Sequence, residues 1–152
     1  MFRTVIAVAF AWPLFFAVPA SAGGPLTVED ARARVLLPSR PGVAWLTIRN
    51  TGGADDRLIG AESPVAARIE LHTHIHGGGV MMMRKVENID LPARGAAALE
   101  PGGDHLMLFG LETGLSPGDH FPLTLLFERA EPVTVDVRIA PLAETTSKHK
   151  HE

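Results

Sequence analysis

The stretch ELHTHIHGGGVMMMRKV, residues 70–86, alternates histidine with other side chains, passes through three glycines and continues in three methionines. Such alternation is typical of a β-strand, and a glycine pair between two strands is typical of a hairpin turn. Side chains of a strand alternate between its two faces. One face would therefore carry Glu70, His72, His74 and His76.

The register of this predicted hairpin depends on which glycine pair forms the turn. A two-residue turn at Gly77-Gly78 would place His72 opposite Met83, with β-carbons about 5 Å apart. A turn at Gly78-Gly79 would place Arg84 opposite His72 instead. We take the first register as the hypothesis, because it brings imidazole next to thioether.

The rest of the chain consists of short apolar runs separated by glycine and proline, without a helical period. Many short strands at this spacing predict an all-β fold, a Greek-key antiparallel β-barrel or sandwich. The expected strands are 33–37, 43–50, 57–59, 68–75, 80–87, 96–99, 105–109, 121–127 and 133–139.

The first 22 residues have the pattern of a signal peptide. A short basic start precedes an apolar run from Thr4 to Val18, and Ala20-Ser21-Ala22 has the small-x-small form of a cleavage site. The run contains Pro13 and is shorter than the roughly 20 residues of a membrane-spanning helix. We expect cleavage after Ala22 and a soluble, exported, periplasmic protein.

Composition limits the remaining choices. The formal net charge is −3 with no basic run, which gives no reason to expect nucleic acid or membrane insertion after cleavage. The chain has no cysteine, so disulfides, a lipoprotein anchor and thiolate metal ligands are excluded. We expect one domain over residues 23–141 and a flexible histidine-containing tail over residues 142–152.

Methionine is confined to the neighbourhood of histidine. Of five methionines, all but Met1 lie at positions 81, 82, 83 and 107. Met82 falls on the face opposite Met81 and Met83, where we expect it to fill a gap in the core. Thioethers are soft, neutral donors and imidazole suits several transition metals, so the mixture favours Cu(I).

The spacing of four of these side chains resembles a known family signature. His72 is followed by ten residues and Met83, then by twenty-one residues and His105-Leu106-Met107. This pattern is similar to that of the periplasmic copper chaperones of the PCuAC type. Flanking stretches such as Asn50-Thr51-Gly52 also look like that family, and the likeness runs from about Val43 to Ile139.

The resemblance implies a cupredoxin-like β-barrel that binds one Cu(I) through His72, Met83, His105 and Met107. It implies delivery of copper to cytochrome c oxidase assembly by ligand exchange. The implied partners are the copper-binding subunit of the oxidase and a thioredoxin-like assembly protein of the Sco type.

Further histidines and one methionine lie outside the signature. They are candidates for accessory ligands of copper, including a second ion as Cu(II), and polar surface residues are the alternative. In the Gly77-Gly78 register Met81 lies opposite His74. The accessory candidates are His74, His76, Met81, His149 and His151.

Other classes of protein fit less well. We do not expect an enzyme: no nucleophile motif or phosphate loop is present, and a three-histidine zinc centre would leave the methionines unexplained. A blue-copper electron carrier needs a cysteine thiolate, which is absent. A periplasmic copper buffer that confers resistance remains the alternative to a chaperone.

Overall fold

The computed structural model describes residues 25–37 and 39–141, and all regular structure in this part of the chain is β-strand. Among these residues no helix could cross a membrane. The strands are β1 (Leu26–Arg34), β2 (Gly42–Asn50), β3 (Asp56–Glu62), β4 (Ala66–Gly77), β5 (Val80–Lys85), β6 (Ile89–Leu91), β7 (Gly95–Leu99), β8 (His105–Leu111), β9 (His120–Phe127) and β10 (Val133–Ile139).

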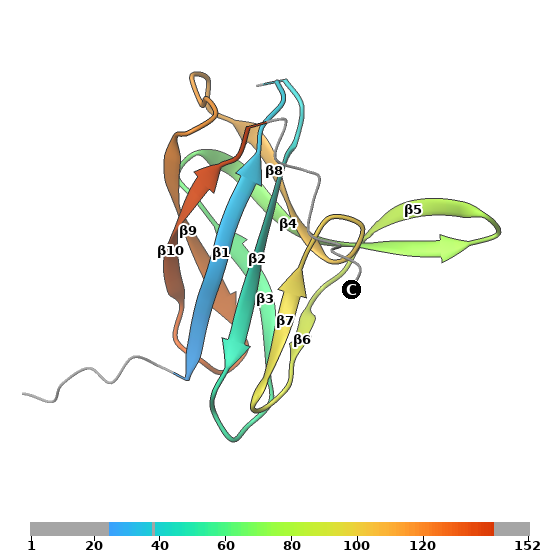
Figure 1. Cartoon of the computed structure of the whole chain (residues 1–152), viewed down its shortest axis with the longest axis vertical. Coiled ribbons are helices and arrows are strands. Elements are labelled where there is room, and N and C mark those ends of the chain that lie inside the picture. The colour runs from blue at the N-terminus through green and yellow to red at the C-terminus, as the bar shows by residue number, and fades with distance from the viewer. Residues whose placement is uncertain (1–24, 38, 142–152) are drawn as a thin grey trace, which may run out of the picture.

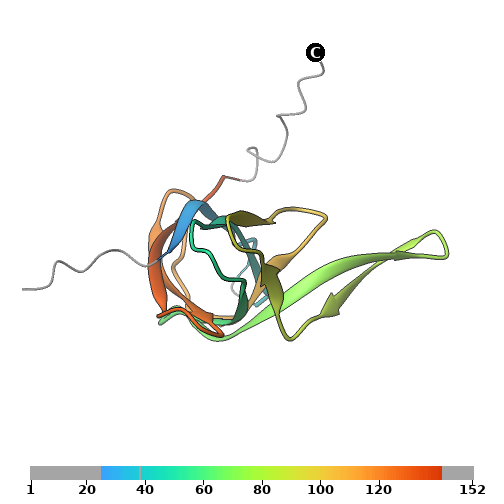
Figure 2. The same ribbon diagram turned by 90° about the horizontal axis from the view of Figure 1, so that it is seen from below.

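The strands form one sheet in the order β5-β4-β8-β2-β1-β10-β9-β3-β6, with β7 also paired to β2. The sheet curls into a barrel, and β3 and β4 contact each other where it closes (Figure 2). All pairs are antiparallel except β1 with β10, which is parallel. The predicted all-β fold is confirmed, with this one exception to antiparallel pairing.

Alternating apolar residues fill the barrel. On β2 every second side chain is buried, and β9 repeats the pattern. Leu106 and Leu108 of β8 have no exposed surface, so they point into the core as their alternation with His105 and Met107 requires. One wall strand therefore packs leucines inward and presents a histidine and a methionine on its other face.

A hairpin arm, residues 73–84, projects from the barrel wall (Figure 1). β4 pairs with β8 only as far as His72, and beyond that residue it pairs only with β5. Every residue of β5 is exposed. The arm consequently has two solvent-facing faces and contributes little to the core.

The turn of the arm corrects the predicted register. Gly78 and Gly79 have φ of 60° and 78°, which a two-residue turn of the type I′ kind requires and glycine allows without strain. Lys85 lies opposite His72, so neither Met83 nor Arg84 does. Moving a two-residue turn by one position shifts the pairing by two, which leaves each side chain on its predicted face.

Opposite Met83 lies His74, and opposite Met81 lies His76. The predicted pairing of imidazole with thioether is therefore present, but it is displaced by one pair toward the tip of the arm. The predicted pairs of Met83 with His72 and of Met81 with His74 are wrong.

Two strands depart from the sequence prediction: one lies at different residues, and the other was not predicted. β1 spans Leu26–Arg34 instead of residues 33–37, and a β-bulge lies between Glu29 and Arg32, with Asp30 at φ 53°. A bulge interrupts the alternation of buried and exposed side chains, so the sequence pattern did not indicate the strand. β6, only three residues long, was not predicted.

A buried carboxylate organises the start of β3. Asp56 accepts hydrogen bonds from the backbone N–H groups of Arg57, Arg129 and Ala130 at 2.8, 3.0 and 2.9 Å. Burial raises the pKa of Asp56, but these hydrogen bonds outweigh it and hold the pKa below its ordinary value. The carboxylate thus ties β3 to the loop after β9.

The predicted signal peptide, residues 1–22, and the predicted tail, residues 142–152, lie outside the described residues. The tail includes His149 and His151. Their predicted roles remain predictions.

Candidate metal site

The predicted metal ligands lie on three neighbouring strands at the base of the hairpin arm. Met83 is on β5, His72 is on β4, and His105 and Met107 are on β8. His72 lies directly opposite His105, and Met107 follows on the same face two residues later. Met83 is a diagonal neighbour of His72, because its direct partner is His74. One face of the sheet thus carries all four side chains.

His105 is the buried member of this set, with 2% of its surface exposed. Its Nδ1 lies 2.9 Å from the carbonyl oxygen of Gly103. A carbonyl only accepts, so Nδ1 carries the proton and Nε2 keeps its lone pair. Burial lowers the pKa of His105 despite this hydrogen bond, and nearby His74 and His72 lower it further. The neutral ring is the form that binds a metal ion.

His72 lies at the centre of the face, between Lys85 and His105. Its ring centroid is 6.0 Å from that of His105 and 6.4 Å from that of Phe109. Its Nε2 lies 3.0 Å from Glu70 Oε2. Its Nδ1 is buried and has no hydrogen-bond partner. A buried nitrogen without a hydrogen-bond partner requires an explanation, and a role as a metal donor is one.

Glu70 is surrounded by positive charge on the same face. Its Oε1 lies 2.9 Å from Arg68 Nε and 3.4 Å from Lys85 Nζ. The hydrogen bond with His72 lowers the pKa of Glu70, burial opposes this effect, and the two cations lower the pKa further. Glu70 is therefore a carboxylate whose two oxygens are already engaged.

His74 approaches His105 more closely than His72 does. The ring centroids of His74 and His105 are 4.9 Å apart, and His74 Nδ1 lies 3.2 Å from the same Gly103 carbonyl oxygen. One carbonyl thus orients two imidazoles. The sequence placed His74 among the accessory residues, whereas the structure places it beside the four predicted ligands, which we call the core set.

The two methionines of the set differ in solvent exposure. Met107 is half-buried on β8, directly opposite Glu70. Met83 is 56% exposed on the hairpin arm. A site made of these side chains would have one sulfur on the barrel wall and one on a projecting, solvent-exposed element.

The outer end of the arm holds a second pair of donors. His76 lies opposite Met81, and both are exposed. Together with residues 77–80 they line a shallow pocket at the turn. These side chains share the face of His74 and Met83, so the row of donors continues from the barrel to the tip.

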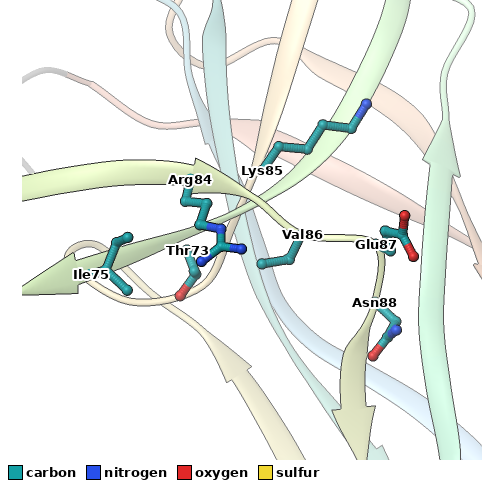
Figure 3. Close-up of a pocket in the computed structure, with 7 residues that line it drawn as sticks. All are labelled: Thr73, Ile75, Arg84, Lys85, Val86, Glu87 and Asn88. Carbon is teal, nitrogen blue, oxygen red and sulfur yellow. The ribbon is translucent and has the colours of Figure 1, made fainter.

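The other face of the arm carries no histidine. A pocket at its base is lined by Thr73, Ile75, Arg84, Lys85, Val86, Glu87 and Asn88, and Figure 3 shows Arg84 beside Thr73 while Lys85 extends away. Met82 lies on this face opposite Ile75 and is 51% exposed. The prediction that Met82 fills a gap in the core is wrong, because the arm leaves the barrel before that residue.

The chemistry of these donors is mixed. In residues 25–37 and 39–141 no group of three or more histidine, aspartate or glutamate side chains is arranged to hold a metal ion. The described part of the chain therefore lacks the three-histidine zinc centre considered from the sequence. The donors that this face offers are imidazole nitrogens and thioether sulfurs, and the sulfurs favour a soft ion.

Sequence reasoning missed two hydrogen-bond acceptors at the site, the Glu70 carboxylate and the Gly103 carbonyl. The alternation of residues 70–76 had placed Glu70 on the histidine face, so a signal for it existed. No sequence signal indicated Gly103, because its role depends on the loop before β8 folding against the arm.

Comparison with solved structures identifies the fold. The copper-bound PCuAC domain from PmoF2 is similar at 26% identity over 78% of this chain and 95% of that chain, with a TM-score of 0.64. CuI-DR1885 from Deinococcus radiodurans is 33% identical over 80% of this chain and 83% of that chain, with a TM-score of 0.63. The predicted cupredoxin-like fold and the likeness to the PCuAC type are confirmed.

Two curated relatives match part of the chain. "Putative lipoprotein Lxx21020" of Leifsonia xyli subsp. xyli is 33% identical over 62% of this chain and 59% of that protein. An uncharacterized protein of Rickettsia prowazekii is 30% identical over 63% of this chain and 54% of that protein. The chain thus covers less than two thirds of the length of either relative.

A family model covers the whole barrel. The family described as "Putative lipoprotein LpqE-like" matches residues 26–139, from the first residue of β1 to the last residue of β10. The solved structures that the chain resembles are named as a copper-bound PCuAC domain and a Cu(I)-bound protein, and this likeness confirms the prediction of a binding protein rather than an enzyme. The chain belongs to the LpqE-like family and has the PCuAC fold.

Proposed function

We propose that this protein is an exported Cu(I) chaperone and that His72, Met83, His105 and Met107 hold the ion. The observation that carries the proposal is the arrangement of two imidazoles and two thioethers on one face of β5, β4 and β8. The 33% identity to CuI-DR1885, which is named for bound Cu(I), supports the same ion here.

Transfer of the ion would proceed by ligand exchange. Neutral donors store little charge in the complex, so an incoming thiolate replaces them one at a time through shared coordination. Met83 is the first donor to leave, since it is exposed on the arm, while His105 is held in the wall. Copper moves from this protein to an acceptor if the acceptor binds Cu(I) more tightly. A difference of about 1.4 kcal/mol in binding free energy already corresponds to a tenfold difference in affinity.

The acceptors we propose lie in cytochrome c oxidase assembly. They are the copper-binding subunit of the oxidase and a Sco-type thioredoxin-like protein, both in the periplasm. A copper buffer that protects the same compartment is the competing function. Deleting the gene separates the two: loss of oxidase activity under copper limitation supports delivery, and loss of copper tolerance supports buffering.

We also propose that the outer donors take a second copper ion. His76 and Met81 lie directly opposite each other in the pocket at the turn, and His74 continues the row toward the core set. Cu(II) prefers imidazole to thioether, so the histidines of the arm and of residues 142–152 suit that oxidation state.

The Cu(I) site is tested by competition with a chelator of known Cu(I) affinity. The wild-type protein should take up one tight Cu(I), and Met83→Ala and Met107→Ala should each lower its affinity at least tenfold. Met82→Ala is the matched control, because Met82 lies on the other face of the same strand with similar exposure. Equal effects of Met82→Ala and Met83→Ala, or tighter binding of zinc than of Cu(I), would reject the site.

A further inference from the structure

We infer that Glu70 and the Gly103 carbonyl preset the tautomers of the site histidines, so that His72 offers Nδ1 to copper while His105 offers Nε2. The inference rests on the proposed copper function. It assigns Glu70 a role as a positioning residue, and it predicts different donor atoms for two histidines that face each other.

The assignment for His72 follows from its two ring nitrogens. Nε2 lies 3.0 Å from a carboxylate oxygen of Glu70. A carboxylate can only accept, so Nε2 carries the proton and donates it, which leaves the lone pair on Nδ1. That Nδ1 is buried without any hydrogen-bond partner. A lone pair that is kept away from water and has no hydrogen-bond partner is a donor atom suited to a metal ion.

Ion pairs at its other oxygen hold the Glu70 carboxylate in the position from which it accepts the His72 hydrogen bond. Arg68 Nε and Lys85 Nζ both contact Oε1, while Oε2 receives His72. The side chain of Arg68 also lies over the ring of Phe109, 4.5 Å from its centroid. The carboxylate is thereby fixed and its charge compensated, which leaves it suited to orient a ligand and poorly suited to bind a soft ion itself.

His105 has the opposite tautomer, and a hydrogen bond to an acceptor again determines it. Its Nδ1 donates to Gly103, so Nε2 is its free donor atom. His74 contacts the same carbonyl through Nδ1 and therefore also presents Nε2. Metal-binding histidines generally donate their second nitrogen to a carboxylate or a carbonyl, and loss of such a partner costs roughly 10–100-fold in metal affinity.

Imidazole ¹⁵N NMR of the metal-free and Cu(I)-loaded protein tests the inference directly, since Cu(I) is diamagnetic. In the metal-free protein His72 should be the Nε2–H tautomer and His105 the Nδ1–H tautomer. Loading should shift Nδ1 of His72 and Nε2 of His105. A shift at Nε2 of His72, or an Nδ1–H tautomer of His72 before loading, would overturn the inference.

Variants of Glu70 provide the second readout. Glu70→Ala should mix the tautomers of His72 and weaken Cu(I) roughly 10–100-fold. Glu70→Gln should retain the tautomer and most of the affinity, because its amide oxygen still accepts from Nε2. Glu62→Ala removes an equal charge from an exposed position on β3 and should change neither readout. Unchanged tautomer and affinity in Glu70→Ala would reject the role of Glu70.

The experiment distinguishes this inference from the function on which it rests. If the wild-type protein takes up no Cu(I), the proposed function fails, and the tautomers of the metal-free protein still report the roles of Glu70 and Gly103. If Glu70→Ala does not fold, the atom that shifts in the loaded wild-type protein decides the donor of His72.

Discussion

His72 lies directly opposite His105 across the β4–β8 pair, with ring centroids 6.0 Å apart. The two residues are 33 positions apart in sequence. Their alignment marks the last paired position between β4 and the barrel wall, because beyond His72 the strand pairs only with β5. The candidate site thus lies where the barrel wall meets the projecting arm.

Removal of the arm methionine should barely change the stability of the metal-free protein. Met83 is 56% exposed, so Met83→Ala should alter the free energy of unfolding by less than about 0.5 kcal/mol. Leu106→Ala, next to His105 but without exposed surface, is the positive control and should cost about 2–5 kcal/mol. Chemical denaturation measures both. A Met83→Ala loss as large as that of Leu106→Ala would mean that Met83 is a packing residue.

Acid should weaken copper binding through the histidines while sulfur remains bound. Protons compete with copper for imidazole, whose free pKa is about 6.5, whereas thioethers do not titrate. Burial lowers the pKa of His105, so this ligand should stay neutral to lower pH than a free imidazole. We expect Cu(I) affinity to fall below about pH 6, with sulfur still visible by X-ray absorption in any copper that remains bound. A copper shell without sulfur at any pH would contradict the donor set.

The stability of the barrel should decline in acid through Asp56. Its pKa is lower in the folded protein than the unfolded value of about 3.9. Its contribution is therefore complete above about pH 4 and is lost as the pH falls through the folded value. Asp56→Asn should cost about 1–3 kcal/mol at neutral pH, because the amide nitrogen that replaces Oδ2 cannot accept the hydrogen bond from the Ala130 backbone N–H.

Unfolding of the wild type and of Asp56→Asn should be compared from pH 7 to pH 2. The difference in free energy of unfolding between them should shrink toward low pH. A difference that is constant over this range would mean that the ionised form of Asp56 has no preference for the folded state.

The outer donors should contribute more to the binding of Cu(II) than to the binding of Cu(I). His74→Ala, His76→Ala and truncation after Thr146 should each weaken Cu(II), measured by electron paramagnetic resonance, and change Cu(I) affinity less than Met107→Ala does. His120→Ala is the control, since His120 lies at the start of β9 and contacts Asp136. A loss of Cu(I) in His74→Ala as large as in Met107→Ala would move His74 into the core set.

The sequence alone determined the donor types, their spacing and their face. Alternation is a local property, since each side chain points away from its neighbour whatever the strand pairs with. Glu70, His72, His74 and His76 were therefore correctly grouped, as were the leucines that point inward from β8. The all-β fold followed from the same short-range patterns, and only the bulged β1 and the three-residue β6 escaped them.

Tertiary structure decided which donors meet. The turn at Gly78-Gly79 moved Met83 from His72 to His74, a choice between neighbouring glycines that the sequence left open. Pairing of β4 with β8 aligned His72 with His105, and the loop before β8 brought one carbonyl to two histidines. Cross-strand register and loop contacts join residues far apart in the chain, so they depend on packing of the whole barrel rather than on any local pattern.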